Sequence, residues 1–166
     1  MTEENQSKLV SSKRIKRIRA QGYFDQTAKE VSDLSIGNRF AYQICTVLVI
    51  TGVVLGNVPL LATLMGISFF GILLPNHPFD YLYNFGVRHL LDRPAVPKRS
   101  KQLKFACTVA TLWLGSVIWL FHTGATIPAQ ILGGMLASVA FTVATFDFCL
   151  PSFIYNTLFR VKVPDN

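Results

Sequence analysis

Four long apolar runs dominate the chain, and they cover residues 40–56, 58–75, 105–121 and 128–150. A helix that crosses the roughly 30 Å hydrocarbon layer of a bilayer needs about 20 apolar residues. A helix of a soluble bundle keeps a polar face, whereas these runs are apolar on every side. The pattern therefore predicts an all-α membrane protein with four transmembrane helices.

Short turns divide the runs into two pairs. Asn57 separates the first two, and a stretch beginning at His122 separates the last two. We therefore expect two helical hairpins. The predicted organisation is a basic N-terminal segment (1–39), a transmembrane domain (40–160) with a central loop (76–104), and a short tail (161–166).

The basic residues predict the orientation. Of the 16 Lys and Arg, eight lie in residues 1–39, six in 76–104 and two after 151, whereas neither turn has one. Positively charged loops remain in the cytoplasm. Both termini and the central loop are thus expected to be cytoplasmic.

The net charge of +7 favours anionic lipid as a partner over nucleic acid, because the basic residues flank apolar runs and form no nucleic-acid reading module.

A short pattern recurs after each predicted hairpin. Residues 82–88 and 154–160 both read apolar-Tyr-Asn-x-x-x-Arg, and a proline precedes each segment. This repetition favours an internal duplication, with chance similarity between two interfacial segments as the alternative. We expect both segments to lie on the cytoplasmic membrane surface as short amphipathic helices, although they could simply end the spans.

A compact basic run precedes the first span at residues 11–19. Such a run attracts an anionic leaflet by about 1 kcal/mol per basic residue, or it serves only as a solvated topology signal. The candidate lipid- or partner-binding residues are Lys13, Arg14, Lys16, Arg17, Arg19, Arg88 and Arg160.

Asp147 is the only carboxylate within a predicted span. A charge there is costly unless it is paired or hydrated. We expect a structural partner such as Arg88 or Arg160, or contact with water. A proton or ion relay is the alternative.

Small residues recur at a spacing of four within the apolar runs, and Gly52 and Gly133 belong to two of these series. Such residues mark faces where helices pack closely, either within the bundle or in a homodimer.

The three cysteines are expected to be free thiols in the cytoplasmic half of the membrane. Aligning the two Tyr-Asn segments places His77 opposite Cys149. A cluster of thiols and an imidazole can bind metal or carry sulfur chemistry. The spacings match no closed metal motif, and buried cysteines are usually inert. We therefore predict no metal and no cofactor, with Cys149 as the one catalytic candidate.

The end of the last run resembles a known family. Residues 146–152, Phe-Asp-Phe-Cys-Leu-Pro-Ser, resemble the Phe-Cys-x-x-Cys ending of the uncharacterised bacterial membrane family catalogued as domain of unknown function 4395. Residues 32–39 and 75–78 are also similar to its pattern. Members sometimes occur beside thioredoxin-like and rhodanese-like proteins, which implies a thiol or sulfur relay. Only Cys149 carries over, because Ser152 stands in place of the second cysteine and residues 20–39 contain no cysteine.

The chain shows no other motif for chemistry, such as a phosphate-binding glycine loop, a nucleophile elbow or a heme attachment sequence. We therefore expect a multi-pass protein of the bacterial inner membrane that is not an enzyme. It would be an accessory or scaffold subunit that docks a protein partner or a second copy. The alternatives are a thiol-dependent sulfur-transfer or redox component that uses Cys149, and a small oligomeric transporter that uses Asp147.

Overall fold

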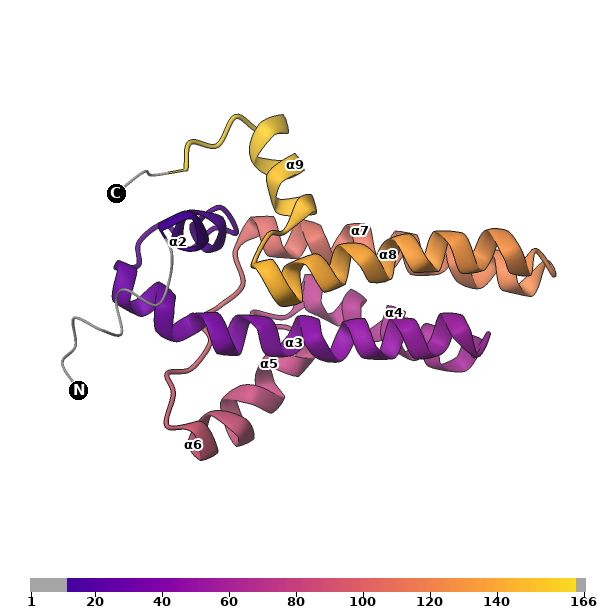
Figure 1. The fold of residues 1–166 in the computed structure, drawn as a ribbon, viewed down its shortest axis with the longest axis horizontal. Coiled ribbons are helices and arrows are strands. Elements are labelled where there is room, and N and C mark those ends of the chain that lie inside the picture. The colour runs from indigo at the N-terminus through magenta and orange to yellow at the C-terminus, as the bar shows by residue number, and fades with distance from the viewer. Residues whose placement is uncertain (1–11, 164–166) are drawn as a thin grey trace.

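The computed structural model describes residues 12–163, and all regular secondary structure in that range is helical (Figure 1). The helices are α2 (Ser12–Arg19), α3 (Ala28–Val54), α4 (Val58–Leu73), α5 (Pro78–Leu82), the π-helical turn η1 (Tyr83–Val87), α6 (Arg88–Leu91), α7 (Lys101–His122), α8 (Thr126–Phe146) and α9 (Leu150–Leu158).

Three of the described helices, α3, α7 and α8, are long and apolar enough to cross a membrane. A fourth span is obtained when α4 is counted together with residues 78–91, which continue from it after a bend of 82°. The helix content is thus that of a multi-pass membrane protein with three or four spans. The predicted four spans correspond to the upper count.

The long helices α3, α4, α7 and α8 form an elongated bundle (Figure 1). The most extensive contacts pair α3 with α8 and α4 with α7. The turns at 55–57 and 123–125 lie at one end, and α2, α5, α6 and α9 lie at the other. The bundle core consists of Val49, Val53, Leu61, Leu64, Leu114, Val117, Leu136 and Ala137.

Helix α3 begins well before the apolar run that starts at Phe40. Its start is set by a capping box, in which the Thr27 hydroxyl accepts a hydrogen bond from the Glu30 N–H and the Glu30 carboxylate accepts one from the Thr27 N–H. This reciprocal pair satisfies backbone donors that a helix start leaves open. The apolar run is therefore only part of a longer helix.

Helix α8 ends at Phe146, before the end of the apolar run at residue 150. Asp147 adopts the left-handed conformation with φ of 55°, which stops the helix. The chain then turns, and Cys149 becomes the N-cap residue of α9. Cys149 consequently lies between two helices and not within the last long one.

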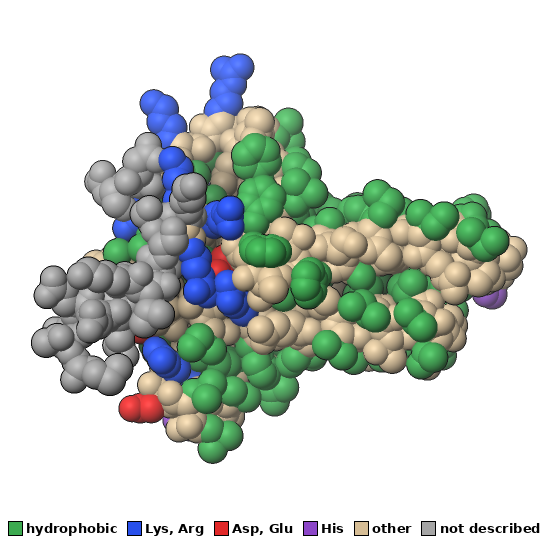
Figure 2. Space-filling model, in the orientation of Figure 1, with side chains coloured by type: hydrophobic (Ala, Val, Ile, Leu, Met, Phe, Trp, Pro, Cys, Tyr) green, Lys and Arg blue, Asp and Glu red, His purple; other side chains and the backbone are tan. Residues whose placement is uncertain are grey.

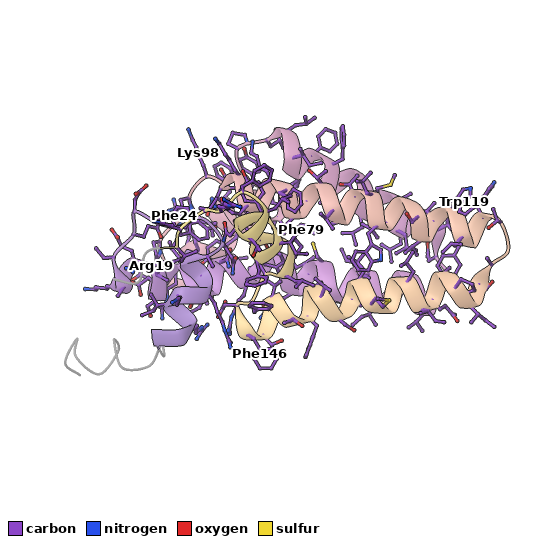
Figure 3. All side chains as sticks on the ribbon, turned by 90° about the horizontal axis from the view of Figure 1, so that it is seen from above. Arg19, Phe24, Phe79, Lys98, Trp119 and Phe146 are labelled. Atoms are coloured by element: carbon purple, nitrogen blue, oxygen red, sulfur yellow. The ribbon has the colours of Figure 1, made fainter. Side chains whose placement is uncertain are left out.

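Charge is confined to one end of the bundle. Residues 40–75 and 105–146 contain no Lys, Arg, Asp or Glu. Figure 2 shows the basic side chains gathered around the end that carries α2 and α9. In Figure 3, Arg19 and Lys98 lie near this end and Trp119 near the opposite one. We call the part formed by α2, α5, α6, α9 and residues 92–100 the charged end.

Candidate functional site

A cavity of about 90 Å³ lies inside the bundle beside the charged end. All three cysteines line it, and each is a free thiol. Its polar lining comprises Tyr42, Cys45, Ser68, His77, Arg99, Cys107 and Cys149. We call this space the thiol cavity. The structure thus brings the thiols and His77 to one place, although they come from distant parts of the chain.

Among the residues that the structure describes, Arg99 supplies the one charged side chain in the wall of the thiol cavity. Its guanidinium pairs with both carboxylate oxygens of Asp80, at 2.7 and 3.1 Å, and both side chains are almost completely buried. The remaining guanidinium nitrogen, Nη1, lies 3.7 Å from the Cys107 sulfur. Asp80 therefore holds a positive charge in a fixed position against a thiol.

The irregular segment that carries Arg99 is held by amide side chains. Asn84 accepts a hydrogen bond from the Val96 N–H at 2.7 Å and donates one to the Val96 carbonyl at 3.0 Å. Asn76 donates to the carbonyls of Val96 and Pro97. The polar residue of the first Tyr-Asn segment thus positions the arginine of the cavity.

His77 is neutral in this site. Burial, assisted by the Arg99 charge and opposed by Asp80, lowers its pKa to about 3. Its Nδ1 accepts a hydrogen bond from the Phe79 N–H at 3.3 Å, which requires an unprotonated nitrogen. His77 is also the N-cap residue of α5, where its own N–H donates to Asp80. The imidazole therefore has a clear structural role.

Cys149 is 4% exposed. Burial raises the pKa of its thiol, while Ser152, Arg99 and Tyr42 oppose that rise. Neither the Tyr42 nor the Ser152 hydroxyl makes a hydrogen bond within normal geometric limits to any described group. The resting thiol is thus protonated, and it is surrounded by groups that favour an anion on sulfur.

Asp147 lies outside the thiol cavity in a second buried cluster. It is completely buried, and its carboxylate accepts hydrogen bonds from Arg14 at 2.5 Å and from Arg39 at 2.8 and 2.6 Å. The partners suggested by the sequence, Arg88 and Arg160, are not the ones that the structure pairs with it. Arg39 reaches Asp147 because α3 continues beyond the apolar run and passes the end of α8.

The basic run is directed largely toward the protein. Arg17 donates to the Phe146 carbonyl at 3.3 Å, and Arg19 is buried and donates to the Gln26 carbonyl at 3.2 Å. Lys16 is exposed. The side chain of Lys13 lies outside the described residues. The run therefore fastens α2 to the C-terminus of α8, whose carbonyl groups favour cations.

The remaining predicted site residues lie on the surface helices. Arg88 donates from Nε to the Asn84 carbonyl at 2.6 Å, and Arg160 is exposed with φ of 50°. Within the part of the chain that the structure describes, no three His, Cys, Asp or Glu side chains are placed to hold a metal ion.

A family model described as Domain of unknown function (DUF4395) matches residues 35–160. The chain belongs to this family. The DUF4395 match contains every residue named in the lining of the thiol cavity, and it leaves α2 outside. The predicted family is thereby confirmed. No curated protein and no solved structure matches the chain.

Three residues that shape the DUF4395 site were not singled out by the sequence: Asp80, Arg99 and Tyr42. Asp80 had a local signal, because an acidic residue three positions after His77 fits a capping box. Arg99 had none, since it is one of six basic residues in 76–104. Only the fold distinguishes it from the other five.

Proposed function

We propose that this DUF4395 protein is a thiol-dependent sulfur-transfer component of the bacterial inner membrane. The observation that carries the proposal is that Cys149 shares one cavity with two further thiols, a neutral imidazole and a buried arginine. A structural cysteine needs none of these groups. Cys149 is the residue that accepts the sulfur atom, because it also has contact with the surface helices.

The proposed reaction is transfer of a sulfane sulfur atom. The Cys149 sulfur attacks the terminal sulfur of a donor persulfide, R–S–SH, and a new S–S bond forms as the bond in the donor breaks. The products are the Cys149 persulfide and R–SH, because the proton of the Cys149 thiol ends on the leaving sulfur. No electron is gained or lost overall. A persulfide is more acidic than a thiol, and Arg99 stabilises its anion.

The test uses the purified protein in mild detergent and glutathione persulfide as the donor. Persulfide-selective tagging followed by peptide mass spectrometry should locate the new persulfide at Cys149. The Cys149→Ser variant should lose this product, whereas Cys45→Ser and Cys107→Ser should retain it. Failure to modify Cys149 under these conditions, with the variants still folded, would exclude the proposal.

The proposed orientation places the charged end in the cytoplasm. The support is the position of Lys and Arg: within the described bundle, the far end has none. Helices α5, α6 and α9 then lie at the headgroup level, where Phe85, Leu90 and Leu158, which are all strongly exposed, contact lipid. In this arrangement Arg88 and Arg160 are positioned for anionic headgroups.

The proposed architecture is an internal duplication of a helical hairpin followed by a surface helix. Its support is that contacts occur in equivalent pairs: α3 packs on α8 as α7 packs on α4, and α3 packs on α5 as α7 packs on α9. Two repeats related by an axis along the membrane normal would produce this pattern.

A second candidate function is that of an accessory subunit that docks a soluble partner at the charged end. It is favoured by the exposed apolar side chains of α6 and α9, which lie close to basic residues. The two functions are compatible, because a sulfur relay needs a protein that supplies or removes the sulfur. The transporter hypothesis gains no support, since Asp147 is fully buried against two arginines.

A further inference from the structure

A second hollow, of about 530 Å³, lies between α2 and α9 on the other side of Cys149. Its size is within the range of small-molecule sites. It is lined by Lys16, Arg17, Ala20, Gln21, Phe148, Cys149, Ser152, Phe153, Asn156, Thr157, Val161 and Val163. We call it the basic groove, because the charged residues among its described lining are Lys16 and Arg17.

Cys149 belongs to the walls of both the basic groove and the thiol cavity. It is the only described residue that the two spaces share. A molecule in the groove can therefore approach the sulfur from the charged end without entering the bundle. This position resolves a difficulty of the proposed function, which requires a donor to reach a thiol that is almost completely buried.

Ser152 gives an independent sign that the groove receives a ligand. It lines the groove, is 1% exposed, and its hydroxyl makes no hydrogen bond within normal limits to a described group. A buried hydroxyl without a partner destabilises the folded protein. A ligand whose polar atoms lie beside Cys149 would satisfy it. The same turn of α9 thus offers a sulfur and a hydroxyl to the same molecule.

The charges of the groove indicate the class of ligand. Lys16 and Arg17 are both exposed at its α2 side, and both charged side chains in its described lining are basic. Arg17 is held there by its hydrogen bond to the Phe146 carbonyl. Phe148 and Phe153 add apolar surface to its lining. The groove therefore suits a molecule with an anionic group at one end and a polarisable, less polar group at the other.

We infer that the basic groove binds a low-molecular-weight persulfide that carries carboxylate groups. The carboxylates lie at Lys16 and Arg17, and the terminal sulfur lies at Cys149 beside the Ser152 hydroxyl. This inference rests on the proposed function, and it names the class of donor and the surface that selects it. Helix α2, which lies outside the family match, then contributes the specificity for an anionic donor.

The test compares two donors that share the same persulfide and peptide chain and differ in whether their carboxylates are free or esterified. Glutathione persulfide carries carboxylates, and the persulfide of glutathione diethyl ester does not. At low donor concentration, the native protein should form the Cys149 persulfide about tenfold faster with the anionic donor, because basic sites raise the local concentration of anions. High salt should reduce this preference.

Variants assign the preference to the groove. The double variant Lys16→Gln/Arg17→Gln should lose most of the roughly tenfold preference. Its rate with the ester is measured alongside, so that a general loss of Cys149 reactivity is separated from a loss of preference for the anionic donor. The single variant Lys16→Gln, which keeps the hydrogen bond of Arg17, should lose part of it. The matched control Lys98→Gln/Lys101→Gln removes two exposed charges that do not line the groove, and it should behave like the native protein.

The outcomes separate the two proposals. If neither donor modifies Cys149, the proposed function fails. If both donors modify it at equal rates, or if the control variant loses as much preference as the groove variant, the proposed function stands and the groove inference fails. If phosphatidylglycerol added to the micelles abolishes the preference, the groove binds lipid headgroups and the inference is likewise overturned.

Discussion

Asp80 and Asp147 are both buried, and each pairs with arginines that are distant in the sequence. Asp80 holds Arg99 in the wall of the thiol cavity, whereas Asp147 holds Arg14 and Arg39 at the end of α8. A buried ion pair stabilises little relative to apolar packing, but removal of one partner is costly. Such pairs therefore fix where side chains lie, and in this protein they fix a positive charge beside thiols.

We predict that Asp80→Asn lowers the free energy of unfolding by about 3 kcal/mol, because it leaves Arg99 buried without a counter-charge. The matched control is Asp33→Asn. Asp33 pairs with Arg93 at 3.4 Å, and both side chains are about one-third exposed. Its loss should cost less than about 1 kcal/mol. Denaturation of the purified variants in detergent micelles measures both changes, and equal losses would contradict the role given to burial.

The candidate site was partly predictable at the residue level. The position of the cysteines along the runs, and the alignment of the Tyr-Asn segments, predicted that His77 and the thiols would lie close together. The ion-pair partners were not predictable in this way. A carboxylate selects its arginine by proximity in the fold, and the sequence alone does not distinguish Arg99 from the other basic residues of 76–104.

At the scale of the helices, apolar runs and helix limits are set by different interactions. The runs reflect contact with lipid, whereas the ends depend on caps and on backbone conformation. The capping box at Thr27 extends α3 beyond its run, and the left-handed Asp147 shortens α8. Hydrophobicity consequently predicted the four long helices, but it misplaced the starts of α3 and α7 and the end of α8, and the last of these determines the surroundings of Cys149.

Small residues allow close helix contact in the bundle. A Cβ atom at Gly133 of α8 would overlap the Val53 side chain of α3, whereas one at Gly134 would meet nothing within 4 Å. We predict that Gly133→Ala destabilises the protein by about 2 kcal/mol through overpacking. Gly134→Ala should be neutral or slightly stabilising, since alanine favours a helix more than glycine does.

Thermal unfolding of the two alanine variants in the same detergent measures the difference. They are adjacent on one helix and add the same methyl group, so any general effect of the substitution is shared. If Gly134→Ala lost as much stability as Gly133→Ala, the close packing of α3 on α8 would not be the cause.

At the scale of the whole molecule, the thiol cavity lies between the two halves of the chain. Cys45 and His77 come from the first half, and Cys107 and Cys149 come from the second. In proteins built from membrane repeats, functional sites commonly lie at the interface between repeats. The proposed duplication thus explains why three isolated cysteines, which have no motif in common, line one cavity beside the charged end.

The charged end must face the cytoplasm if the sulfur donor is a small cytoplasmic molecule. We therefore predict that a cysteine at position 123, introduced by Thr123→Cys in a background without the native cysteines, reacts with a membrane-impermeant maleimide added to intact cells. Lys98→Cys in the same background should react only after the inner membrane is permeabilised. Both positions are exposed, at opposite ends of the bundle. If Lys98→Cys reacted in intact cells and Thr123→Cys did not, the basic residues would lie outside, against the rule that retains them in the cytoplasm. The basic groove would then be out of reach of a cytoplasmic donor.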